Sequence, residues 1–144
     1  MTVNRAMFSS KDHDWATPQA LVDGLALIYA GHQAFDLDVC ATPETAKAPH
    51  YFTPDDDGLA QEWRGFCWMN PPYGREIGKW VRKAWQEGQR EGTTVVCLVP
   101  CRTDTGWWTE YVTKAESIIY MRGRIRFGGS SAGAPFPTAI VVFR

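Results

Sequence analysis

The four residues Asn70-Pro71-Pro72-Tyr73 combine a side chain and a backbone that could bind a planar group carrying an –NH2. The two prolines fix two φ angles and remove two backbone donors, so this stretch offers carbonyls that can only accept hydrogen bonds. The Asn70 side-chain oxygen and the Pro71 carbonyl would form a pair of acceptors for an –NH2 group, and Tyr73 would add a flat face for stacking. The competing interpretation is a proline-rich turn that ends a strand, and the residues on both sides favour a functional loop.

The segments on either side of this loop place it at an edge of a sheet. The apolar run over residues 66–69 is typical of a buried parallel strand, and residues 76–91 have the spacing of an amphipathic helix. The loop therefore follows the carboxyl end of a strand, where open α/β sheets bind their ligands. A second loop, which begins at Pro100 and contains Arg102, follows the predicted buried strand over residues 93–99.

A further strand over roughly residues 35–39 would end near Asp38. An acid at the carboxyl end of a strand, followed by small residues, is a usual place to receive the polar end of a cofactor. No Gly-x-Gly follows, which excludes a dinucleotide-binding loop. Asp36 on the same strand could be the functional acid instead, or both acids could only keep the strand soluble.

The first half of the chain also contains a predicted helix and an acidic turn. Thr17 as N-cap and Pro18 at the first helical position predict a helix over residues 18–30, with Gly31 as its C-cap. Residues 42–65 look irregular and include the run Asp55-Asp56-Asp57. This run would by default be a solvated turn, and it could also place a carboxylate near an adenine amino group or a ribose hydroxyl. Residues 41–65 are too few for two further βα units, which predicts an abbreviated sheet.

The C-terminal part combines apolar strands with a row of arginines. We expect a helix over residues 106–114, in which Trp107 and Trp108 belong to the core, and a strand over residues 117–121. Residues 122–127 are predicted to form a hairpin with a closing strand over residues 138–143. The candidates for phosphate contacts are Arg102, Arg122, Arg124 and Arg126, the last three on one face of this segment. The alternative is an edge strand that charge protects from aggregation.

Composition limits the remaining possibilities. With 144 residues and 44% hydrophobic content, the chain is expected to form a single domain over residues 14–144, after a flexible lead-in over residues 1–13. The net charge of −1 permits at most a local basic patch. The polar N-terminus and the lack of a long apolar run predict a cytoplasmic protein without a membrane span. The four cysteines form no Cys-x-x-Cys pair, so we expect reduced thiols and no metal site.

Together these motifs resemble those of adenine-specific DNA N6-methyltransferases that use S-adenosylmethionine, most closely the small phage-encoded N-6-adenine methyltransferase family. The segments that carry the resemblance are residues 15–18, 36–43, 51–54, 57–59, 70–74, 100–104 and 123–127. The fold that the resemblance implies is α/β, an abbreviated Rossmann-like methyltransferase sheet, mostly parallel with an antiparallel C-terminal hairpin. The glycine-rich end of the first cofactor motif and a separate target-recognition domain are both missing from this pattern.

The resemblance also implies roles for individual residues. Thr17 and Pro18 would touch the methionine end of the cofactor, and Asp57 would meet its adenine. The first cofactor motif would comprise Asp38, Cys40 and Ala41, and the catalytic motif Asn70, Pro71, Pro72 and Tyr73. The implied partner is DNA in the cytoplasm of a bacterial host, with the target adenine flipped out or single-stranded. The alternatives are a methyltransferase acting on RNA bases or on a protein glutamine amide, and a non-catalytic nucleic-acid-binding relative.

Overall fold

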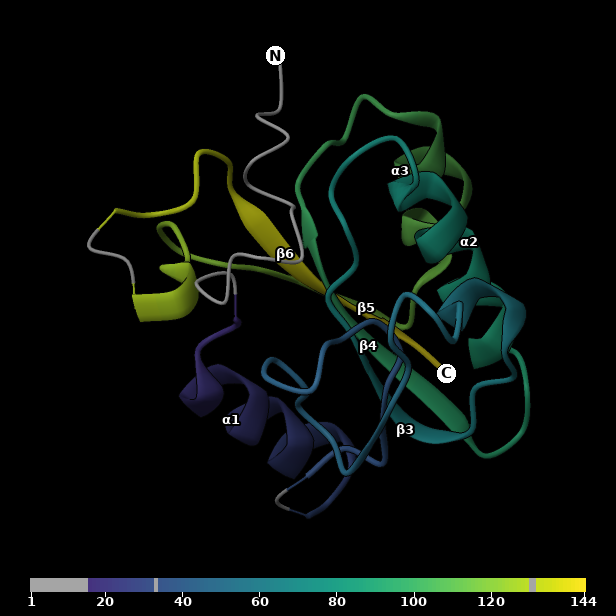
Figure 1. Cartoon of the computed structure of the whole chain (residues 1–144). Helices are drawn as coiled ribbons and strands as arrows, with labels where there is room; N and C mark the ends of the chain where they lie inside the picture. Colours follow the sequence, from purple (N-terminus) through teal and green to yellow (C-terminus); the bar gives the residue numbers. More distant parts are fainter. Residues whose placement is uncertain (1–15, 33, 130–131) are drawn as a thin grey trace.

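A six-stranded sheet with helices on both faces forms the protein (Figure 1). The computed structural model describes residues 16–32, 34–129 and 132–144. The strand order is β2-β1-β3-β4-β6-β5, in which β2, β1, β3 and β4 pair in parallel and β6 is antiparallel to both β4 and β5. The strands are β1 (Leu37–Asp38), β2 (His50–Tyr51), β3 (Gly65–Met69), β4 (Thr93–Pro100), β5 (Ser117–Tyr120) and β6 (Thr138–Phe143). The predicted α/β sheet, mostly parallel with antiparallel strands near the C-terminus, is confirmed.

Helices cover the sheet from opposite sides. The α-helices are α1 (Gln19–Tyr29), α2 (Ile77–Gly88) and α3 (Gly106–Glu110), and short 3-10 turns lie at Gly58–Ala60, Val112–Lys114 and Phe127–Gly129. Figure 1 shows α1 on one face of the sheet and α2 and α3 on the other. Because both faces are covered, every residue of β4 is buried, as its continuous apolar sequence predicts.

The core confirms the predicted inward faces. Trp108 of α3 is buried, and Trp107 packs against the core from a partly buried position, as expected. The predicted amphipathic helix has a buried apolar face in α2, which comprises Ile77, Trp80, Val81 and Ala84. The largest fully buried side chains are Trp63, Trp68, Phe35, Phe143, Met69 and Leu98.

The arginine-rich segment differs from its prediction. Residues 122–126 are not a strand, and the antiparallel neighbours of β6 are β4 and β5, so the predicted hairpin between residues 122–127 and 138–143 is wrong. Gly123 has φ 73°, which turns the backbone out of the extended path directly after β5. The alternation of side chains persists nevertheless, with Ile125 and Phe127 buried and the three arginines exposed.

Two other predictions concern the region over residues 42–65 and the segments that were expected to be flexible. The strand β2 lies within the region that looked irregular. It could not be predicted, because a strand of two residues is too short to show an alternation of side chains. The predicted lead-in over residues 1–13 lies outside the described residues, as do residues 130–131 of the predicted flexible tip.

Candidate active site

The carboxyl ends of β1 and β3 flank the point at which the strand order reverses. The chain passes from β1 to β2 on one side, and β3 then pairs with β1 on its other side. Open α/β sheets bind their ligands at such a switch point. Asp38 pairs in register with Trp68, and Asn70 follows two residues later. The topology therefore brings the predicted cofactor motif and the predicted catalytic motif together.

The side-chain amide of Asn70 is held at both ends. Its Nδ2 donates to Thr17 Oγ1 at 3.1 Å, and its Oδ1 accepts from the Tyr73 hydroxyl at 2.7 Å. The prediction that Thr17 caps a helix is wrong, because α1 begins at Gln19 with Pro18 as the cap residue and has no side-chain cap. The Thr17 hydroxyl, on a residue that is 3% exposed, contacts Asn70 of the loop that follows β3 instead.

Tyr73 does not present the flat face that its sequence context suggested. The residue is only 3% exposed, and its ring meets Phe136 edge-on with a centroid distance of 5.4 Å. Its hydroxyl also lies 3.0 Å from the carbonyl of Leu98 in β4. Burial raises the pKa of Tyr73 well above its ordinary value of 10.0, so the hydroxyl stays protonated at neutral pH. Pro72, by contrast, is exposed on this loop, and Pro71 is buried.

The Arg102 side chain binds the backbone of the loop over residues 70–73. Its Nη1 donates to the carbonyl of Tyr73 at 3.0 Å, and its guanidinium carbon lies 5.9 Å from the centre of the Phe136 ring. Its Nη2 is buried and has no hydrogen-bond partner among the described residues. Arg102 was predicted as a phosphate contact, and the structure places its guanidinium against the loop, partly buried.

Asp38 shapes the loop that follows β1. The residue is 2% exposed, and its two carboxylate oxygens accept from the backbone amides of Cys40 at 3.2 Å and Lys47 at 3.0 Å. Asp36, the other candidate acid, is exposed and precedes β1. Its carboxylate accepts from the amide of Phe66 near the amino end of β3, away from the carboxyl edge of the sheet. Asp38 is therefore the acid at the carboxyl edge, and its oxygens are already engaged by the loop.

The carboxyl of Asp38 is expected to make stability depend on pH. Burial raises its pKa from the ordinary 3.8 to about 7, against the lowering effect of the Lys47 and Cys40 amides and the Lys47 charge. Because the folded pKa is the higher one, the stabilisation is present below about pH 4 and is lost as the pH rises toward about 7. We expect the unfolding free energy of the wild type, relative to Asp38→Asn, to fall over this range and to level off above it. Urea titrations at each pH measure this difference, and parallel profiles would contradict it.

The acidic turn packs against the end of β1. Asp57 is exposed and has φ 54°, a left-handed conformation that is uncommon outside glycine and is enriched at functional sites. The next residue must be glycine, because a Cβ on Gly58 would lie 2.2 Å from the carbonyl of Val39. The predicted adenine-binding carboxylate thus lies on a turn whose neighbour touches the end of β1.

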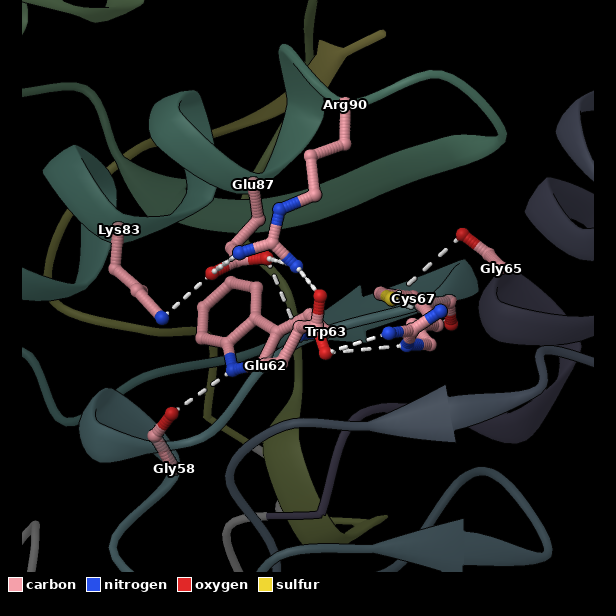
Figure 2. Close-up of polar contacts among 9 residues, drawn as sticks. Gly58, Glu62, Trp63, Gly65, Cys67, Lys83, Glu87 and Arg90 are labelled. Carbon is pink, nitrogen blue, oxygen red and sulfur yellow. Dashed lines mark hydrogen bonds and ion pairs between the residues drawn. The ribbon is translucent and has the colours of Figure 1, made fainter.

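An ionic cluster around the buried Glu87 holds the far end of this turn (Figure 2). The indole of Trp63 donates to the Gly58 carbonyl at 2.8 Å, and the Trp63 amide donates to Glu87 of α2 at 3.2 Å. Glu87 is 2% exposed and pairs with Lys83 at 2.6 Å and with Arg90 at 3.1 Å. Arg90 also pairs with the exposed Glu62. This cluster could not be recognised from the sequence, because Lys83, Glu87 and Arg90 have the spacing of ordinary surface ion pairs on a helix.

The arginine-rich segment lies next to the Thr17 end of the site. The amide of Gly128 donates to the carbonyl of Ala16 at 2.9 Å, and Ala16 directly precedes Thr17. Arg122, Arg124 and Arg126 are exposed on this segment.

Comparisons with known proteins identify the family of the chain. A family model described as DNA N-6-adenine-methyltransferase (Dam) matches residues 5–139. The chain belongs to the Dam family of DNA N-6-adenine-methyltransferases. It is 33% identical over 135 residues to the DNA N-6-adenine-methyltransferase of Haemophilus phage HP1 (strain HP1c1), across 92% of this chain and 76% of that protein. It is 27% identical over 109 residues to the enzyme of the same name from Escherichia phage T1, across 74% of this chain and 44% of that protein. The resemblance inferred from the motifs is confirmed.

A Dam-family enzyme needs a methyl donor. The residues at the switch point suit a donor molecule that carries polar groups at its ends. The exposed Asp57 carboxylate can accept from an amino or hydroxyl group, and the residues that follow β1, Cys40 and Ala41, have small side chains. The side chains of Asp38 and Thr17 are buried and hydrogen-bonded within the protein. In the part of the chain that is described, no His, Cys, Asp and Glu side chains gather as a metal site, and no helix is long and apolar enough to span a membrane.

Proposed function

We propose that the protein transfers the methyl group of S-adenosylmethionine to N6 of an adenine in DNA, with the target base flipped out or single-stranded. The observation that carries the proposal is the amide of Asn70, held by Thr17 and Tyr73 at the switch point of a sheet in a Dam-family chain. The cofactor would be held by Asp57, by the backbone of residues 38–41 and by the Thr17-Pro18 segment.

The hydrogen-bond acceptors of the catalytic loop would make N6 of adenine, which is a poor nucleophile, more reactive. The N6 lone pair is delocalised into the ring, so hydrogen bonds from its N–H groups to Asn70 Oδ1 and the Pro71 carbonyl would localise it. The same bonds would stabilise the positive charge that grows on N6 during attack, which is electrostatic stabilisation by fixed dipoles. Asn70 Oδ1 has two lone pairs, so it can accept from the target while it accepts from Tyr73.

The remaining requirements are alignment and access. S-adenosylmethionine supplies an activated methyl group, so the protein has to hold N6 in line with it at about 3–3.5 Å. No general base is required, because the methylated nitrogen loses its extra proton readily, and the motif contains no histidine. An adenine inside a duplex cannot reach Asn70, which is why the base must leave the stack.

The deciding experiment incubates the protein with S-adenosylmethionine labelled in its methyl group and, separately, with DNA, RNA or a mixture of proteins. We expect label in DNA, recovered as N6-methyladenine after digestion. Label in RNA or in protein glutamine instead would replace this proposal by one of the alternative acceptors. The absence of transfer to any acceptor, together with retained DNA binding, would favour a non-catalytic relative. Sequencing of the modified DNA then identifies the adenines that are methylated.

The exposed arginines of residues 122–126, on the segment whose Gly128 contacts Ala16, are expected to contact phosphates. Replacing both Arg124 and Arg126 by Gln should weaken DNA binding uniformly across sequences and reduce the slope of log K against log salt by about 2, or about 1 per contact. The matched control is Arg64→Gln, whose side chain is 79% exposed before the amino end of β3, away from the site. Filter binding over a salt series measures both slopes, and equal slopes for the double variant and the control would contradict the assignment.

A further inference from the structure

The strand β5 forms one edge of the sheet, and in the part of the chain that is described it pairs only with β6. The amide of Met121, directly after β5, donates to the Thr138 carbonyl of β6 at 3.1 Å. Backbone groups alternate in direction along an antiparallel strand, so those of Ile119 also face β6, whereas those of Ile118 and Tyr120 point away from the sheet. The outer side of β5 is therefore a template on which a further strand can pair.

This edge lacks the features that usually protect an edge strand. Natural edges carry charged residues or proline, and the four residues of β5 include neither. The large hydrophobic side chains that are exposed in the described part of the chain are Leu27 and Ile28 of α1 and Ile119 and Tyr120 of β5. The end of α1 lies beside this edge, because the Tyr29 hydroxyl is 3.3 Å from Ser117 Oγ of β5. Exposed apolar side chains thus gather at one edge of the molecule, as they do at sites of protein association.

We propose that β5 pairs in antiparallel fashion with β5 of a second copy of this chain, about a twofold axis at Ile119. In this register Ile118 lies opposite Tyr120 of the second copy, and the same pair recurs on the other side of the axis. The outward amides and carbonyls of these two residues then exchange hydrogen bonds across the pair. A β-branched residue opposite an aromatic one is also a favourable cross-strand pair. Because the same surface meets itself, the contact closes as a dimer and does not extend into a fibre.

The charges at the two ends of β5 favour the antiparallel arrangement. Glu116 directly precedes the strand, Arg122 follows it, and both are exposed. An antiparallel partner brings each Glu116 close to Arg122 of the second copy, whereas a parallel partner would bring like charges together. Glu116 already binds Arg144 through Oε2 at 2.7 Å, and its Oε1 can accept from Arg122. Arg122 then belongs to the interface, which leaves Arg124 and Arg126 as the candidates for phosphate contacts.

Sedimentation equilibrium of the full chain without DNA tests the dimer, because it measures mass and does not depend on methyl transfer. The wild type is expected to pass from monomer to dimer between about 1 and 100 µM, since the contact is at the small end of specific interfaces. Arg122→Glu places glutamates together at both ends of the strand pair and should raise Kd at least about tenfold. The control is Arg82→Glu, the same change of charge on an exposed residue of α2, and it should leave Kd unchanged.

A second variant with the opposite change of charge makes the test specific for the proposed register. Glu116→Arg alone should weaken the dimer as Arg122→Glu does, because arginines then meet arginines. An equal mixture of the two variants should associate about as tightly as the wild type, since every arginine of one variant then faces a glutamate of the other. Circular dichroism establishes that each variant is folded, and mixing would not restore the association of misfolded chains.

A wild type that stays monomeric over this concentration range would overturn the inference. So would a dimer that both substitutions leave intact, or a mixture of the two variants that does not associate. Hydrogen exchange at the amides of Ile118 and Tyr120 should slow as the dimer forms. Protection of these amides in the monomer would mean that another segment of the same chain covers the edge, and a second copy could then not bind there.

Discussion

The Asn70→Ala variant is expected to transfer methyl groups to DNA about 100- to 1,000-fold more slowly than the wild type while it stays folded and binds DNA. The magnitude is that of removing one fixed dipole from a group that gains charge in the transition state. The Pro71 carbonyl remains as a second acceptor, so a residual rate is expected. Tyr73 retains the Leu98 carbonyl as a partner, and therefore the variant leaves no stranded hydroxyl proton in the core.

The matched control for Asn70→Ala is Gln89→Ala. This change also removes a carboxamide, from an exposed residue at the end of α2 whose Nε2 donates to the Trp85 carbonyl. Single-turnover rates with labelled S-adenosylmethionine, and DNA binding measured separately, compare the two variants. Methylation by Asn70→Ala at the rate of the wild type would refute the mechanism, whereas a joint loss of rate and DNA binding would assign Asn70 to binding.

The features that could be predicted from the sequence have a local signal. Strand β6 has the predicted bounds, and β3 and β4 each extend one residue beyond theirs, because continuous apolar runs mark strands that are covered on both faces. The inward face of α2 follows from its spacing of apolar residues. The place of Asn70 at a carboxyl edge follows from the strand before it. The switch point could be located only once the order of strands in the sheet was known, and that order is decided by which strands pair with one another.

The features that could not be predicted depend on partners far away in the sequence. Thr17 has the local pattern of a helix cap, and its true partner, Asn70, is 53 residues away. Tyr73 looked like an exposed aromatic residue because Phe136, which packs against its ring, belongs to another part of the chain. The alternating arginines suggested a strand, and Gly123 with its positive φ ends that path. For Thr17 and Tyr73, tertiary contacts override the local pattern, whereas at Gly123 a local turn does.

Glu87→Ala is expected to be the most destabilising change in the chain outside the apolar core, by about 3–5 kcal/mol. The change leaves Lys83, whose side chain is 18% exposed, without its partner at 2.6 Å, and removes the acceptor of the buried Trp63 amide. A buried ion pair adds little over apolar packing, but removal of one partner strands the other charge away from water. Glu87→Gln keeps the shape and can still accept from Trp63, so its loss should be smaller. Urea unfolding measures the three free energies.

Glu62→Ala is the matched control, because it removes a glutamate from the same cluster (Figure 2) at a position whose side chain is 47% exposed. Exposed ion pairs contribute about 0–1 kcal/mol, so the control should change stability by no more than that. Equal losses for Glu62→Ala and Glu87→Ala would mean that burial does not decide the contribution of this cluster. Since Trp63 also holds Gly58, the folded Glu87→Ala protein, which lacks the acceptor for the Trp63 amide, should bind S-adenosylmethionine more weakly if the Asp57 turn contacts the cofactor. A loss of stability with unchanged cofactor affinity would separate the support of the fold from the support of this turn.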